Sequence, residues 1–432
     1  MPPHPFGVIS VTLFCASLAY TMAHPSRGYF SQVNRVMSRS RFVAFSSGFV
    51  VGCIVFSALA AWGAGPPDGR RYTITDLGPG FVQAIAKENT TVVGTQQEAS
   101  GAQVAREFTP ANTALPLLPQ GTFSAAEGVL HAGRIVGWSS TDTSGSHTHA
   151  VAWENGVARD LGTLGSTDLL SQATAATTDD IGGVCSTDDL SQLVPCVWVQ
   201  SQNILQLDTL GGPDGHIEAM NEQGDALGNS LTAAGATHCT YWPAAGGVID
   251  CNPPGATLSF GLDMNSAGLH VGFADVPAGR RAFVGLPYGQ IILAPLAGGI
   301  TSTATGINDL NEIVGTSRTP GQCASCPEPL HAATIWIQGQ PYELLPAVTN
   351  GTGWQLLDAI GLNNDGLIIG VGTLNGVRHS FLLIPQDNTV VAWYRWKAGI
   401  NRWYQHRYDR WRKSIDWYYA YYARRAAQAA RQ

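Results

Sequence analysis

A short phrase recurs along the chain at a nearly constant spacing, and this period restricts the possible folds more than any other feature. The phrase is an Asn or a substitute, a Gly three residues later, two apolar residues and a closing residue that is usually Gly. The copies close at positions 94, 137, 185, 228, 272, 315 and 370, so the period is near 44 residues. Asn and Gly tolerate the positive φ of a tight turn, and the apolar pair begins a second strand. Each copy therefore predicts a β-hairpin within a repeated unit.

Two more strands are expected after each hairpin. The third strand often opens with His or Arg and closes with Trp, as in His149–Trp153, and the fourth runs into Asp, Leu, Pro or Gly. The last repeat stops after its third strand, at His379–Pro385, while Tyr72–Gly78 is an unmatched fourth-strand phrase. A ring that shares these two strands leaves no free sheet edge. The sequence therefore predicts an all-β, seven-bladed β-propeller of four-stranded repeats over residues 72–385, closed by the N-terminal strand.

Three local copies of these phrases are especially clear: Gly306–Asp309 (GIND), His149–Trp153 (HAVAW) and Asp160–Gly165 (DLGTLG). They resemble the HAF repeat family, extracellular proteins with tandem Gly-Ile-Asn-Asp turns and His-Ala-Phe strands. The resemblance covers residues 72–385 and implies an extracellular, propeller-like repeat protein. It implies no particular activity, and the third-strand Phe is kept only at positions 108, 283 and 381.

The N-terminal part of the chain differs from the repeats. Residues 1–36 fit upstream read-through before a start at Met37. Residues 37–64 are expected to be a signal peptide or a membrane anchor, because two Arg precede the uncharged run Phe42–Trp62, which ends in a small-x-small sequence. The predicted location is therefore extracytoplasmic, whether periplasmic, cell-envelope or secreted.

The C-terminal part, residues 386–432, is a basic tail rich in aromatic residues. Within residues 393–422 the Trp, Tyr and Ile side chains recur every three or four positions, which is typical of an amphipathic helix. The pattern is compatible with a helix packed on the propeller or a partly disordered tail, and equally with attachment to an anionic membrane surface.

The cysteines indicate an oxidising compartment. Two of the eight lie in the leader, at Cys15 and Cys53. The other six form close pairs, and adjacent strands would bring the partners within bonding distance: Cys185/Cys196, Cys239/Cys251 and Cys323/Cys326. We therefore expect three local disulfides. A redox or metal site is the alternative for the last pair.

No catalytic or nucleotide-binding signature occurs in the chain, and we expect no cofactor and no metal. The net charge is -7, and because both ends are basic the repeats themselves are acidic, which argues against nucleic acid as a partner. The acidic pairs Asp179-Asp180 and Asp188-Asp189 are compatible with Ca²⁺, but their turn positions explain them as well.

Function is expected on the propeller face that carries the longer, more variable connections, which join the second strand to the third and the fourth to the next blade. The candidate ligand-binding residues there are Asp142, His147, Asp168, Asp188, Asp189, Asp214, His216, Arg280, Arg281, Arg318 and Trp354. The leading interpretation is a binding or interaction scaffold for a glycan or an envelope protein, rather than an enzyme. The alternative is a polysaccharide hydrolase or lyase, which a pocket with two convergent carboxylates would favour.

Overall fold

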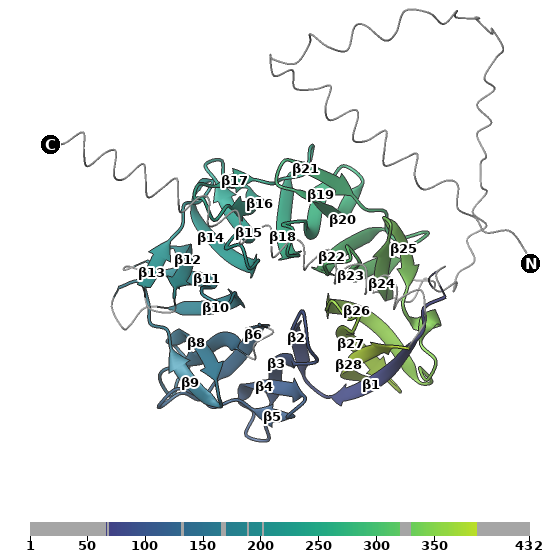
Figure 1. Cartoon of the computed structure of the whole chain (residues 1–432), viewed down its shortest axis with the longest axis horizontal. Helices are drawn as coiled ribbons and strands as arrows, with labels where there is room; N and C mark the ends of the chain where they lie inside the picture. The colour runs from purple at the N-terminus through teal and green to yellow at the C-terminus, as the bar shows by residue number, and fades with distance from the viewer. Residues whose placement is uncertain are drawn as a thin grey trace, which may run out of the picture. The chain divides into compact units, whose positions relative to one another are not determined.

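The computed structural model of the protein describes Pro66 and residues 69–130, 134–165, 170–187, 190–200, 203–319 and 330–386. All of these belong to the unit Leu59–Gln432. The described chain forms 28 β-strands in seven four-stranded antiparallel sheets around a central axis, as Figure 1 shows. The predicted leader segments and the tail beyond residue 386 lie outside the described residues. Within these ranges, no helix is both long enough and apolar enough to span a bilayer.

Each sheet is one propeller blade, with its first strand at the axis (Figure 1). The innermost strands are β2 (Phe81–Ile85), β6 (Ser124–Val129), β10 (Ser171–Ala176), β14 (Gly211–Met220), β18 (Leu258–Met264), β22 (Thr301–Ile307) and β26 (Trp354–Leu362). The second strands are β3 (Val92–Gln97), β7 (Ile135–Ser140), β11 (Ile181–Ser186), β15 (Ala226–Thr232), β19 (His270–Val276), β23 (Ile313–Thr319) and β27 (Ile368–Leu374). The third strands are β4 (Gln103–Thr109), β8 (Thr148–Glu154), β12 (Leu193–Val199), β16 (Thr237–Trp242), β20 (Gly279–Leu286), β24 (Leu330–Ile337) and β28 (Val377–Pro385). The outer strands are β5 (Thr113–Ala114), β9 (Val157–Asp160), β13 (Asn203–Gln206), β17 (Ile249–Asp250), β21 (Gly289–Ile292), β25 (Gln340–Glu343) and β1 (Tyr72–Gly78), and a 3₁₀ turn, η1 (Leu345–Ala347), follows β25.

The outer strand of the seventh blade comes from the other end of the repeat region. β1 pairs antiparallel with β28, with Tyr72 opposite Pro385 and Ile74 opposite Leu383. This is the pairing expected from the unmatched first phrase. An ion pair also joins the two strands, because His379 Nδ1 lies 2.8 Å from Asp76 Oδ1.

The innermost strand of every blade contains at least one extra residue where it pairs with the second strand, and β14 and β26 each have a second register shift. In β22, for example, Ala304 pairs with Gly315 and Gly306 pairs with Val314, so Thr305 between them has no partner. The same register shift occurs in the other six first strands. Such β-bulges re-aim a side chain out of the regular alternation.

A glycine of the second strand lies beside each bulge, and the packing there explains why it recurs. A Cβ added to Gly315 would lie 2.0 Å from the carbonyl oxygen of Thr303, far inside contact distance. The other six glycines are equally close to a first-strand carbonyl: Gly94, Gly137, Gly183, Gly228, Gly272 and Gly370. In the third blade this position is Gly183, so the sequence alignment that closed that phrase at Cys185 was wrong by two residues.

The Asn of the recurring phrase joins neighbouring blades. The side chain of Asn308 is buried; its Oδ1 accepts two N–H groups of its own turn, and its Nδ2 donates to the carbonyl of Asn363 in the next blade at 3.1 Å. Asn265 donates to the carbonyl of Asn308 in the same way, and Asn363 donates to that of Asn89. The Asn thus shapes the turn, as predicted, and also links one blade to the next.

The hydrophobic core lies between the blades. One cluster combines Val93 and Ala105 of the first blade with Ile135 and Trp153 of the second. The indole of Trp153 donates to the carbonyl of Pro116 at 2.8 Å, and Trp242 and Trp336 make equivalent bonds in later blades. The third-strand Trp therefore serves interblade packing.

Two of the expected disulfides are present among the described residues. Cys185 on β11 is bonded to Cys196 on β12, and Cys239 on β16 is bonded to Cys251, which directly follows β17. The third predicted pair, Cys323 and Cys326, lies outside the described residues. Disulfides persist in oxidising compartments, so the two bonds indicate an extracytoplasmic location.

Candidate functional site

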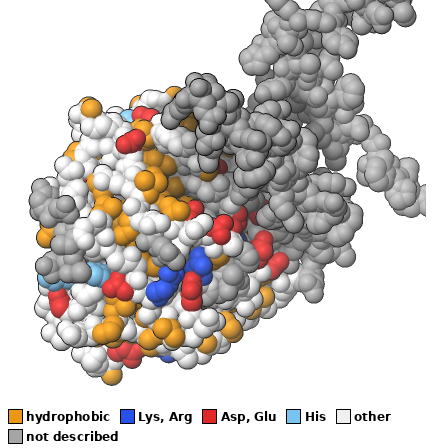
Figure 2. Space-filling model, turned by 60° about the vertical axis from the view of Figure 1, so that its left-hand side comes forward, with side chains coloured by type: hydrophobic (Ala, Val, Ile, Leu, Met, Phe, Trp, Pro, Cys, Tyr) orange, Lys and Arg blue, Asp and Glu red, His pale blue; other side chains and the backbone are white. Residues whose placement is uncertain are grey.

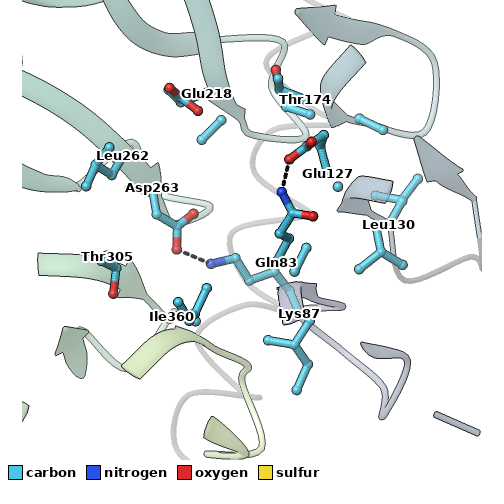
Figure 3. A pocket seen from close by; sticks show the side chains of 18 of the residues that line it. Gln83, Lys87, Glu127, Leu130, Thr174, Glu218, Leu262, Asp263, Thr305 and Ile360 are labelled. Atoms are coloured by element: carbon cyan, nitrogen blue, oxygen red, sulfur yellow. Dashed lines mark hydrogen bonds and ion pairs between the residues drawn. The ribbon is translucent and has the colours of Figure 1, made fainter. Parts of the chain in front are cut away.

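The candidate site is the central channel, which one bulge side chain from each blade lines. These residues are Gln83, Glu127, Thr174, Glu218, Leu262, Thr305 and Ile360. Figure 3 shows them around a common space. We call this set the bulge ring. The backbone position is the same in all seven blades, but the side chains differ, so the ring has no chemical symmetry.

The polar members of the bulge ring are concentrated in the first four blades. Glu127 accepts hydrogen bonds from the Gln83 amide and from the Trp138 indole, the latter at 3.3 Å. Burial raises the pKa of Glu127, and the negative charge of Glu218 raises it further, against the lowering effect of the two hydrogen bonds. Glu218 Oε1 itself lies 2.9 Å from His216 Nε2. This half of the ring therefore holds two carboxylates, of which Glu127 retains its proton to higher pH than an ordinary Glu.

One side chain crosses the channel at the end that carries the hairpin turns. The ammonium group of Lys87, which follows β2, lies 2.6 Å from Asp263 Oδ2 on β18 (Figure 3). It also lies 2.7 Å from the carbonyl oxygen of Ile307. Asp263 Oδ2 also accepts the backbone N–H of Ile307. Lys87 therefore links the first blade to the fifth and sixth, and it supplies positive charge at this end of the cavity.

The channel cavity has a volume of about 1000 Å³, within the range of small-ligand sites. Its charged lining is predominantly acidic: Glu88, Glu127, Glu218, Glu222, Asp263, Asp309 and Asp358, against Lys87 and Arg378. On the face shown in Figure 2, acidic side chains are scattered in small groups, whereas Lys and Arg gather in one place. The channel therefore favours ligands that bring positive charge or hydrogen-bond donors.

Several of the predicted long-loop residues form hydrogen bonds or ion pairs within their own loop or with neighbouring backbone. In the loop after β7, Asp142 Oδ2 lies 2.8 Å from His147 Nδ1, and this contact, with further hydrogen bonds from the loop, lowers the pKa of Asp142 well below its usual range. Asp214 accepts the N–H of Leu193 at 2.9 Å. Arg281 donates to the backbone carbonyls of residues 280 and 300.

Two of the remaining predicted residues line a second, smaller cavity. Arg280 and Arg318 line a cavity of about 380 Å³, where Arg280 forms a two-pronged ion pair with Asp275. Trp354, expected on the binding face, is instead only 7% exposed and packs edge-on against Phe381.

His216 is the predicted residue that the structure connects to the channel, through Glu218. Asp168, Asp188 and Asp189 lie outside the described residues. In the turn after β10, Asp180 accepts the N–H of Gln200 at 3.0 Å, as a turn residue would.

Sequence reasoning missed the bulge ring, although the repeat carries a signal for it. Where the phrase opens with Asn, the ring residue stands three positions before it, as Thr305 does before Asn308 and Glu218 before Asn221. Alignment of the repeats on this Asn would therefore have shown which residues face the axis.

Comparisons with known proteins give limited information. No family model matches the sequence, and no curated protein matches it. Among solved structures, a putative TolB from Agrobacterium tumefaciens is 10% identical, with a TM-score of 0.37, and the match covers 52% of this chain and 88% of that one. TolB from Acinetobacter baumannii is 12% identical, with a TM-score of 0.35 and coverage of 74% and 80%. The Dos1 propeller is 8% identical, with a TM-score of 0.35 and coverage of 73% and 96%. At these values the likenesses carry no argument about function.

Proposed function

We propose that the chain is an exported binding scaffold that takes its ligand in the central channel, at the bulge ring. The bulge ring carries this proposal, because seven equivalent backbone positions present seven side chains of unequal chemistry around a cavity of about 1000 Å³. A ring that served only to hold the blades together would need no such variation. Binding sites are concave and combine apolar walls with a few placed polar groups, and the channel has this character.

The distribution of side chains in the bulge ring indicates the class of ligand. Gln83, Glu127, Thr174 and Glu218 come from four consecutive blades, and Leu262 and Ile360 lie on the other side of the channel (Figure 3). Carboxylates and amides accept hydrogen bonds from hydroxyl or amine groups. Thr305 and Asp263 also lie on the side of the channel that carries the two apolar residues, so this side is of mixed polarity (Figure 3). A ligand with several hydrogen-bond donors and small apolar patches fits this lining. A glycan segment has that chemistry, and we propose it as the ligand class.

Export is supported by the two disulfides, together with the sequence of residues 37–64 and the resemblance to HAF repeat proteins. The first residues of two sequence phrases that carry that resemblance are in contact: His149 Nδ1 lies 2.8 Å from Asp160 Oδ2. We propose family membership on this basis. The long-loop face around Arg280 and Arg318 and the tail at residues 393–422 are proposed as additional contact surfaces, toward an envelope protein and an anionic membrane respectively.

The binding proposal is tested on a glycan array and then by calorimetry with the best glycan. Glu218→Gln removes a negative charge from the bulge ring with little change of shape, and we expect it to weaken binding by about 1–3 kcal/mol. Tyr288→Ser is the matched control, since Tyr288 is 85% exposed and does not line the channel. Equal affinity of both variants and the parent protein would place the ligand elsewhere.

A polysaccharide hydrolase or lyase is the second candidate, and one observation favours it. The raised pKa of Glu127 beside a second carboxylate is the arrangement that general acid catalysis requires. Glu127→Gln distinguishes the two functions when binding and turnover are measured side by side. Turnover by the parent protein that disappears in this variant, with binding retained, would establish the enzyme instead.

A further inference from the structure

A second cluster of reactive side chains lies away from the channel, between the fourth and fifth blades. It consists of the disulfide-bonded Cys239 and Cys251 and of His270, the first residue of β19. All three side chains are 0% exposed. One ring nitrogen of His270 and the two sulfur atoms lie within 4.8 Å of one another. The arrangement brings two sulfurs and an imidazole together in a buried cluster.

The imidazole of His270 has an unused nitrogen. Its Nδ1 lies 3.3 Å from the carbonyl oxygen of Gly268, which can only accept, so Nδ1 carries the proton. Nε2 then holds a lone pair, and among the described residues it has no hydrogen-bond partner. The rings of Tyr241 and Phe283 pack nearby. A buried polar atom without a partner is costly, and its presence in a folded protein calls for an explanation.

The state of His270 matches that of a metal ligand. A metal-bound His usually donates its other N–H to a carbonyl or carboxylate, which orients the ring, and Gly268 supplies that carbonyl. Burial lowers the pKa of His270 to about 4, so the ring is neutral near pH 7 and its lone pair is available.

We propose that Cys239, Cys251 and His270 bind one thiophilic divalent ion, such as Zn²⁺, when the disulfide between the two cysteines is reduced. A dithiol or phosphine reductant supplies two electrons, and two protons convert the S–S bond into two thiols while the reductant is oxidised. Binding of the ion then releases both thiol protons. Two thiolates, a neutral imidazole and a divalent cation have no net charge, which suits a buried site.

The geometry requires the two sulfur atoms to move apart once the bond between them is broken, while the imidazole nitrogen already lies near both. Zinc–sulfur and zinc–nitrogen bonds of about 2.3 and 2.1 Å place the ligands of a tetrahedral ion about 3.5–3.8 Å apart, and the three atoms already lie within 4.8 Å. Three protein ligands leave a fourth position for water. The cluster thus has two exclusive states: a disulfide within the fourth blade under oxidising conditions, and under reducing ones a metal ion that also binds His270 of the fifth blade.

The test uses the full chain with the other six cysteines, Cys15, Cys53, Cys185, Cys196, Cys323 and Cys326, replaced by Ser. The protein is reduced with a phosphine under anaerobic conditions and titrated with Co²⁺, whose absorption reports thiolate ligation and coordination geometry. We expect one Co²⁺ per chain with sulfur-to-metal charge transfer, displacement by Zn²⁺, and no binding by the oxidised protein. Near-ultraviolet circular dichroism and thermal unfolding follow the fold in the same samples, and Zn²⁺ should raise the unfolding temperature of the reduced protein.

Two variants separate a metal site from simple thiol binding. Cys239→Ser should lose the charge-transfer band, and His270→Gln should weaken Co²⁺ binding at least about tenfold, which corresponds to about 1.4 kcal/mol. His238→Gln, whose ring faces Asp250 instead, should bind like the parent protein. Failure of the reduced protein to bind, equal binding by His270→Gln, or a reduced chain that is unfolded and that metal does not restore would each overturn the proposal.

Discussion

The burial of one histidine predicts a specific loss of stability in mild acid. His270 is fully buried, and burial lowers its pKa from 6.5 to about 4 because the charged form is poorly solvated there. Between these two pH values the unfolded chain binds a proton that the folded chain does not. The free energy of unfolding is therefore highest above pH 6.5, where the ring is neutral in both states, and it decreases as the pH falls toward 4. The difference between 6.5 and about 4, at about 1.4 kcal/mol per pH unit, amounts to about 3 kcal/mol.

The assay is urea unfolding followed by tryptophan fluorescence at several pH values between 7.5 and 4.5, with the disulfides intact. His270→Gln removes the titrating group and therefore does not lose this stability in acid. As the pH falls from 7.5 to 4.5, the free energy of unfolding of the variant should rise by about 2–3 kcal/mol relative to that of the parent. His147→Gln is the control, because it removes a histidine from the loop after β7 and leaves His270 in place, so the loss of stability assigned to His270 should remain. A constant difference between the parent and His270→Gln at all pH values would refute the reasoning.

Three further predictions follow from the strand contacts and the disulfides. Gly315→Ala should destabilise the fold by about 3 kcal/mol in urea unfolding, because the new Cβ would overlap a carbonyl oxygen, whereas Gly289→Ala meets nothing within 4 Å and should have little effect; equal stabilities would contradict this account. Deletion of residues 72–78 exposes the edge of β28 and should cause aggregation visible by light scattering, so a stable monomer would speak against the shared blade. Alkylation and mass spectrometry of native exported protein should find Cys185 and Cys239 unlabelled, and labelling of either would count against the disulfides.

The repeat phrases allowed the architecture to be predicted because each phrase has a local physical cause. The Asn308 turn and the Cys185/Cys196 pair depend on neighbours close in sequence or on adjacent strands. The period then gave the number of blades. The error at Cys185 has a simple reason: the third blade has Thr177 in place of the recurring Asn and a turn that is one residue shorter, so the alignment slipped past Gly183.

The site could not be predicted in the same way, because it is made across blades. Glu127 and Glu218 come from strands that are far apart in the sequence, and a bulge shifts each of them out of the alternation used to assign inward and outward positions. Trp354 illustrates the converse error. It follows a long connection and was expected on the surface, but Phe381 and His379 give it an aromatic environment in which it is buried.

The bulges place the side chains that line the channel at positions outside the backbone pairing that forms the blades. A residue such as Thr305 contributes no pair to the strand ladder, while the flanking pairs and the glycine opposite remain the same from blade to blade. Each blade therefore offers one position outside the strand ladder, although Thr305 also donates a hydrogen bond to the carbonyl of Ala359 in the next blade. Duplication and divergence of a single repeat can change the channel lining at these positions while the ladder stays the same. A combinatorial library randomised at these seven codons would explore channel chemistry without redesign of the scaffold.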